Sequence, residues 1–137
     1  MIKSFLGAAA LTSALLLSPM ASAAALDGTW LTESGETKVA FAPCGAATCG
    51  TIQWQKTPRA DTENPDATKR SRPLVGAVML SDIREDGAGR WKGQLYNIEN
   101  GKTYSGTLDL QSPERMKLSG CVLGGLVCKS QIWTRVK

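Results

Sequence analysis

The sequence predicts an all-β domain, built as a small antiparallel up-and-down barrel of eight strands, with a two-sheet sandwich as the alternative. After the N-terminal segment the chain shows no long apolar periodicity of the helical kind, and short apolar runs alternate with turn residues. Nearly all of these runs are joined by short turns, which is typical of neighbouring antiparallel strands. Such a meander exposes two sheet edges unless it closes, and eight strands is a number at which barrels close.

The N-terminal segment is predicted to be a signal peptide over residues 1–23. Lys3 supplies its positive charge, residues 14–17 form its apolar centre, and Pro19 ends the apolar helix. Ala23 and the small residues before it match the requirements of a signal peptidase, so cleavage is expected near Ala23. A membrane anchor is the less favoured alternative, because polar residues interrupt the apolar run and no basic cluster follows it.

The mature chain, residues 24–137, is expected to be one domain of about 114 residues that is periplasmic or secreted. It keeps 15 basic and 12 acidic residues, and the basic ones are scattered, so no nucleic-acid partner is predicted. Histidine is absent, which removes the usual general base at neutral pH and a common metal ligand. We therefore predict no enzymatic activity, no cofactor, no metal and no transmembrane segment in the mature chain.

The expected strands follow the order of the apolar runs. They lie at residues 28–32, 38–43, 50–56, 74–80, 90–97, 103–110, 116–121 and 129–136. Asn100 and Gly101 form the strongest hairpin signal, since both tolerate positive φ. Residues 74–80 are apolar at nearly every position, as in a strand buried on both faces. Residues 57–73 hold three prolines and little that is apolar, and they are expected to form a long polar loop.

The four cysteines form two close pairs, Cys44 with Cys49 and Cys121 with Cys128. An even number of cysteines in an exported chain indicates disulfides, and three connectivities are possible. Local pairing is the simplest, because each pair brackets an expected hairpin turn, whereas cross-pairing requires the two turns to be neighbours. A zinc site is disfavoured, since four and six intervening residues differ from the common two-residue spacing.

A tryptophan and an arginine near the two ends of the mature chain indicate how a barrel would close. Gly28-Thr29-Trp30 opens the first expected strand, and Arg135 lies on the last. A guanidinium group can lie on an indole face while its nitrogens bond nearby carbonyls. This arrangement resembles that of the calycins (lipocalins, fatty-acid-binding proteins and avidins). The resemblance implies that Trp30 and Arg135 clasp one end of the barrel.

Short motifs are spread over the whole mature chain. They are LDGTWLT at 26–32, APCG at 42–45, CG at 49–50, NPD at 64–66, RSRPLVG at 70–76, NGKTY at 100–104, GC at 120–121, and Cys128 followed by QIWTR at 131–135. In this order the motifs resemble the bacterial exported family called domain of unknown function 2147. The resemblance implies a signal peptide, paired cysteines and a small barrel-like domain, and it implies no catalytic residues.

Aromatic residues on the expected strands are candidates for lining a ligand pocket. Phe41, Trp54, Trp91 and Tyr104 occupy alternating positions that could face the barrel interior. Side chains often fill the interior of a small barrel, so a filled or nearly filled core is favoured over an aromatic-lined pocket.

The long polar loop is a second candidate region. Its length is unusual for a connection, and Arg70 and Arg72 could bind a ligand or help to cover a barrel mouth. Alternatively, both arginines could pair with the acidic residues of the same loop at the surface, where such pairs contribute little to stability. The sequence favours neither alternative.

Together these features predict a non-enzymatic binding module for a small apolar or amphipathic ligand. The candidate ligand-binding residues are Trp54, Trp91, Tyr104, Arg70 and Arg72. The alternative is an envelope structural or interaction protein with a filled barrel that acts through its surface. Interior volume distinguishes the two, because ligand pockets usually exceed about 300 Å³.

Overall fold

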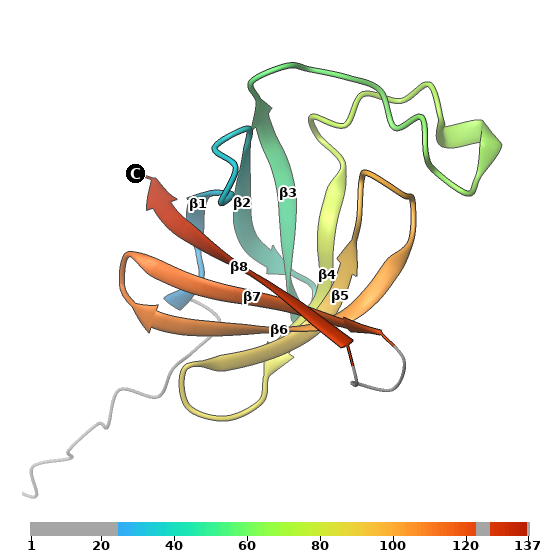
Figure 1. The fold of residues 1–137 in the computed structure, drawn as a ribbon. Coiled ribbons are helices and arrows are strands. Elements are labelled where there is room, and N and C mark those ends of the chain that lie inside the picture. The colour runs from blue at the N-terminus through green and yellow to red at the C-terminus, as the bar shows by residue number, and fades with distance from the viewer. Residues whose placement is uncertain (1–24, 123–126, 137) are drawn as a thin grey trace, which may run out of the picture.

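The computed structural model describes residues 25–122 and 127–136, and its fold is a closed antiparallel β-barrel (Figure 1). Its eight strands pair in chain order: β1 (Gly28–Leu31), β2 (Thr37–Cys44), β3 (Ala47–Gln55), β4 (Val78–Glu85), β5 (Arg90–Tyr96), β6 (Thr103–Ser112), β7 (Arg115–Val122) and β8 (Val127–Val136). A short 3₁₀ helix, η2 (Ala67–Lys69), lies in the loop between β3 and β4. The predicted eight-stranded barrel is confirmed, and the predicted signal peptide lies outside the described residues.

The barrel closes between its first and last strands. β1 pairs antiparallel with both β2 and β8, and Trp30 of β1 lies opposite Arg135 of β8. Because the described strands form a closed ring, the two-sheet sandwich is excluded. We call the end with the β2–β3, β4–β5 and β6–β7 turns the closed end. The end with the β1–β2, β3–β4 and β5–β6 connections is the open end.

A tryptophan-rich core fills the barrel from the closed end. Trp30, Trp91 and Trp133 have no exposed surface, and they pack in one cluster with Leu108 and Met116. Burial of each large apolar side chain contributes about 1.5–3 kcal/mol. The rings of Trp133 and Phe41 lie 6.3 Å apart and are tilted, which is a favourable arrangement of aromatic rings. The core is therefore solid at this end.

A bulge between β2 and β3 turns Trp54 outward. The pairing register shifts between Lys38 and Val39, so β3 carries one extra residue before Trp54. As a result Ile52 and Gln55 are buried, whereas Trp54 is 39% exposed and the Lys38 ammonium lies 4.8 Å from its ring centre. The expectation that Trp54 faces the barrel interior is wrong, because alternation predicts the face of a side chain only while the register is unbroken.

The fourth strand begins later than the sequence predicts. Residues 74–77 form a turn, closed by a 2.9 Å hydrogen bond from the Ala77 N–H to the Leu74 carbonyl, and β4 starts at Val78. Gly76 has a φ of 96°, a left-handed conformation that suits a turn and not a strand interior. Leu74 is nevertheless buried. The apolar run thus reflects a turn with a buried leucine, whose N–H donates to the Arg59 carbonyl, and not a strand buried on both faces.

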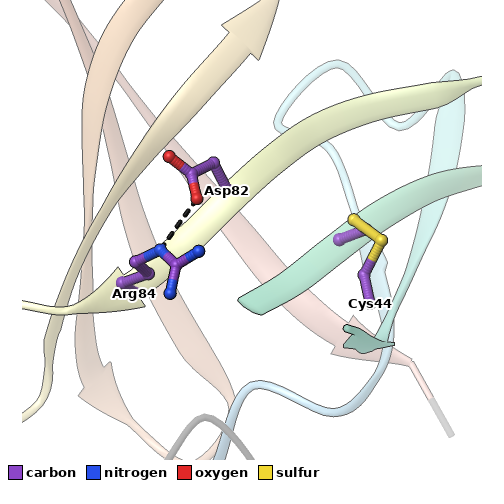
Figure 2. Close-up of a disulfide and its surroundings, with 4 residues drawn as sticks. Cys44, Asp82 and Arg84 are labelled. Carbon is purple, nitrogen blue, oxygen red and sulfur yellow. Dashed lines mark hydrogen bonds and ion pairs between the residues drawn. A yellow bond between two sulfur atoms is a disulfide. The ribbon is translucent and has the colours of Figure 1, made fainter. Parts of the chain in front are cut away.

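Both disulfides are local. Cys44 bonds to Cys49 across the β2–β3 hairpin, and Cys121 bonds to Cys128 across β7 and β8. Figure 2 shows the Cys44 disulfide near β4, where Arg84 donates to Asp82. The local pairing is therefore confirmed, and each short loop contributes about 2 kcal/mol by restricting the unfolded chain.

Candidate functional site

A cavity of about 650 Å³ occupies the barrel interior toward the open end. The β1–β2 turn, the start of the long loop and the β5–β6 turn contribute to its lining, together with inward side chains of β4 to β8. Trp133 belongs to the buried core and also lines the cavity, so it forms part of the floor. The volume lies within the range of about 300–1,000 Å³ that is typical of ligand pockets. The expectation of a filled or nearly filled barrel is therefore wrong.

The inward positions near the closed end hold large packed side chains, whereas one inward position farther toward the open end is a glycine. Near the closed end, Trp91 of β5 lies opposite Leu108 of β6, and both are buried. Farther along, Gly120 of β7 lies opposite Lys129 of β8, and both line the cavity. A Cβ atom added at Gly120 would lie 3.6 Å from its nearest neighbour, a Cδ of Leu95. A Cβ atom at this position would therefore make an ordinary van der Waals contact without a clash, at a residue that borders the cavity.

The structure distributes the predicted ligand-binding residues among three places. Tyr104 lines the cavity, and its hydroxyl accepts a 2.8 Å hydrogen bond from the Asn100 side chain. Trp91 lies in the core without exposed surface, and Trp54 lies on the outer face of β3. Arg70 and Arg72 belong to the loop between β3 and β4 and are not part of the cavity lining. Of these candidates, only Tyr104 contributes to the cavity.

A buried carboxylate anchors the long loop. The Asp61 side chain has no exposed surface. It accepts three hydrogen bonds, at 2.7 Å from Asn64, 3.0 Å from Arg72 and 2.6 Å from the Tyr96 hydroxyl. Arg72 thus pairs with an acid of its own loop, while Arg70 donates to the Asn64 carbonyl. Because Tyr96 also lines the cavity, the carboxylate ties the loop to the cavity wall.

Burial and hydrogen bonding shift the pKa values at this anchor. Burial alone would raise the pKa of Asp61, but the hydrogen bonds from Asn64, Tyr96 and Arg72 outweigh it and hold the pKa below the ordinary value of 3.8. Burial, followed by the hydrogen bond to Asp61 and its charge, raises the pKa of Tyr96 to about 12. At neutral pH the carboxylate is therefore charged and the phenol neutral, as their hydrogen bond requires.

Two polar residues of β8, Lys129 and Gln131, line the cavity and are absent from the predicted site residues. They alternate with Trp133 along the strand, so the three side chains share the inward face. The indole N–H of Trp133 donates to Oε1 of Gln131 at 3.0 Å. A core tryptophan on the last strand was the signal that could have found them, because alternation from Trp133 places both residues inside.

At the closed end, Arg135 covers Trp30. The guanidinium carbon lies 4.4 Å from the centre of the Trp30 ring. Its three nitrogens donate to backbone carbonyls of Pro113, Asp27 and Ala25 at 2.6–2.7 Å. The Trp30 indole in turn donates to the Leu26 carbonyl at 2.9 Å. These contacts join the beginning of the domain, the β6–β7 turn and the last strand.

Other kinds of site do not stand out in the described part of the chain. Within residues 25–122 and 127–136, no three Cys, Asp or Glu side chains are placed to hold a metal ion. No helix in these ranges is long and apolar enough to cross a membrane. At the cavity mouth, Arg59 and Glu99 form an ion pair with each other. The barrel cavity is therefore the candidate site.

The closed eight-stranded ring and its cavity place the fold among the lipocalin-like barrels. A similar solved structure is protein HP1028 from the human pathogen Helicobacter pylori, described as belonging to the lipocalin family. The two chains are 24% identical with a TM-score of 0.73, and the match covers 82% of this chain and 83% of that one. At this identity the likeness concerns the fold alone. The chain belongs to the family of uncharacterized proteins conserved in bacteria called domain of unknown function 2147, whose model matches residues 28–135. No curated protein matches the chain.

Proposed function

We propose that the protein is an exported, non-enzymatic binding protein that holds a small apolar or amphipathic ligand inside its barrel. The observation that carries this proposal is the cavity of about 650 Å³ toward the open end. Its lining combines apolar side chains, among them Met79, Leu95 and Leu118, with a larger number of polar ones, most of which lie on the connections at the open end. This mixture suits an amphipathic ligand. The lipocalin-like fold supports it, because barrels of this size can enclose one small ligand.

Gly120→Phe tests whether a ligand enters the cavity. The added ring projects from an inward position of β7 into the open space, so it competes with any occupant. We expect it to weaken binding of the neutral apolar dye N-phenylnaphthylamine by about tenfold or more, which corresponds to at least about 1.4 kcal/mol. A fluorescence titration measures this directly, because the dye brightens in an apolar environment.

Ser105→Phe is the matched control. Ser105 is exposed and lies opposite Gln94 on the outer surface, so the same ring is added without reaching the cavity. This variant should bind the dye like the unaltered protein, and both variants should retain a cooperative melting transition. Equal dye affinities for all three proteins would place the dye outside the barrel and contradict the proposal, as would a lack of binding to the unaltered protein.

We further propose that the protein reaches an oxidising compartment after cleavage near Ala23. The predicted signal peptide over residues 1–23 and the two disulfides support this, because disulfides persist mainly in exported proteins. After expression of the full chain in a Gram-negative bacterium, N-terminal sequencing of the periplasmic protein should begin within two residues of Ala24. Recovery of the uncleaved chain from the membrane fraction would contradict this prediction.

A further inference from the structure

Two exposed polar side chains on one wall of the cavity, Lys129 and Gln131, offer hydrogen-bond donors. Within the described ranges, the Lys129 ammonium forms no ion pair, although its side chain lies on the cavity lining. Gln131 lies two residues farther along β8, and its Oε1 accepts from the Trp133 indole. This bond fixes the orientation of the amide, so the two N–H donors of Gln131 point away from the indole.

The acceptors of the cavity are largely occupied. The Oδ1 atoms of Asn97 and Asn100 accept hydrogen bonds from backbone N–H groups of their own turn. Glu99 is paired with Arg59. The remaining carboxylate of the lining is Glu36, which is exposed on the β1–β2 connection and makes no ion pair with Lys129. The wall formed by β8 thus presents positive charge and donors without a neighbouring counter-ion.

The geometry leaves room for a headgroup at this wall. Inward side chains two residues apart on a strand are separated by about 7 Å, so Lys129 and Gln131 can reach one small group together. Gly120 lies opposite Lys129 and places no side chain over it, while Leu118 lies opposite Gln131. Apolar side chains of the lining, including Leu95 and Leu118, offer a surface for a hydrocarbon tail.

We propose, on the basis of the cavity function above, that the ligand is an amphipath with a single anionic headgroup, which Lys129 and Gln131 bind inside the barrel. An ammonium–anion hydrogen bond is roughly twice as strong as a neutral one. The shared chemistry is an anionic oxygen, supplied either by a carboxylate or by a phosphate monoester. Lys129 sets the charge preference of the site, and Gln131 adds directional donors.

Four ligands with the same ten-carbon chain test the charge preference: decanoate, decyl phosphate, decanol and decylamine. Isothermal titration calorimetry at low salt should show that at least one of the two anions binds about tenfold or more tightly than decanol, with decylamine weakest. The tighter anion identifies the headgroup. If the protein binds decanol as tightly as both anions, the proposal is overturned. It is also overturned if the protein prefers decylamine, which would indicate that a cationic headgroup binds to Glu36.

Lys129→Met tests the residue. Methionine keeps much of the apolar length and removes the charge, so anion affinity should fall about tenfold or more while decanol affinity stays within about twofold. Lys117→Met is the matched control, because Lys117 lies on the outer face of β7 opposite Ile132 and does not line the cavity. It should leave anion binding unchanged. Unchanged anion binding by Lys129→Met, or an equal loss in both variants, overturns the proposal.

The neutral dye separates this inference from the function on which it rests. If Gly120→Phe weakens dye binding but the anions bind no more tightly than decanol, the cavity is a binding site and the proposal of an anionic headgroup is wrong. If neither the dye nor any of the four ligands binds, the cavity function itself fails.

Discussion

Replacing Asp61 with asparagine should lower the free energy of unfolding by about 2–4 kcal/mol. The carboxylate has no exposed surface and accepts hydrogen bonds from Asn64, Arg72 and Tyr96 through its two oxygens. An amide keeps the shape but offers one acceptor oxygen, and its NH₂ group must face a donor that has lost its partner. Urea unfolding, followed by tryptophan fluorescence, measures the loss.

Asp66→Asn is the matched control for this prediction. Asp66 lies in the same loop, where its side chain accepts from the backbone N–H of Thr68 at the start of η2. Asparagine caps a helix as well as aspartate does, so the free energy of unfolding should change by less than about 0.5 kcal/mol. A midpoint for Asp61→Asn equal to that of Asp66→Asn would mean that the buried anchor contributes little.

The same anchor should make stability depend on pH at both extremes. The folded pKa of Asp61 is lowered, so its contribution is present above the ordinary value of 3.8 and is lost as the pH falls through the folded pKa. The pKa of Tyr96 is raised to about 12, so its contribution is present below the ordinary value of 10.0 and is lost as the pH rises toward 12. Unfolding free energies of the unaltered protein and Asp61→Asn should therefore begin to converge as the pH falls below about 4, and the difference should shrink further as the pH falls through the folded pKa. A constant difference at acid pH would contradict this linkage.

Local signals explain why the strand order could be predicted from the sequence. Asn100 and Gly101 mark a hairpin through their own backbone preferences, and the two cysteines of each pair are only 5 and 7 residues apart in the sequence. The predictions for Trp54 and for residues 74–80 are wrong because the regular alternation of a strand is interrupted at both places. One extra residue in β3 reversed the face of Trp54, and the left-handed Gly76 converted the start of an apolar run into a turn. Neither event leaves a distinct pattern in a single sequence, because both are settled by pairing with distant strands.

The cavity could not be predicted because alternation specifies the face of a side chain but not its height in the barrel. Trp91 and Lys129 both occupy inward positions, yet one is packed in the core and the other lines open space. The position of a side chain along the barrel axis depends on the register between strands. The free volume beside it depends on the residue that lies opposite, such as Gly120 across from Lys129. The long loop was predicted as polar, but the burial of Asp61 depends on Tyr96, which is 35 residues away.

Arg135→Ala should lower the free energy of unfolding by about 2–3 kcal/mol. The guanidinium stacks on Trp30 and donates to three backbone carbonyls, two of which, Asp27 and Ala25, lie more than 100 residues earlier in the chain. Removal of the side chain exposes an indole that has no accessible surface and leaves carbonyls without their donor. Because these contacts join β1 to β8, the lost free energy of unfolding should reflect a weaker closure of the barrel between these two strands.

Two further variants distinguish the contribution of the stacked, hydrogen-bonded guanidinium group to stability from the contribution of its positive charge alone. Arg135→Lys keeps the positive charge but cannot span three carbonyls with a planar fork, so it should recover less than half of the loss. Arg115→Ala removes an exposed arginine from neighbouring β7 and should change the free energy of unfolding by less than about 0.5 kcal/mol. Thermal or urea unfolding of the three variants distinguishes these cases. If Arg135→Ala unfolds together with Arg115→Ala, the contact over Trp30 does not stabilise closure, and the β1–β8 pairing and the tryptophan-rich core hold the two ends of the chain together without it.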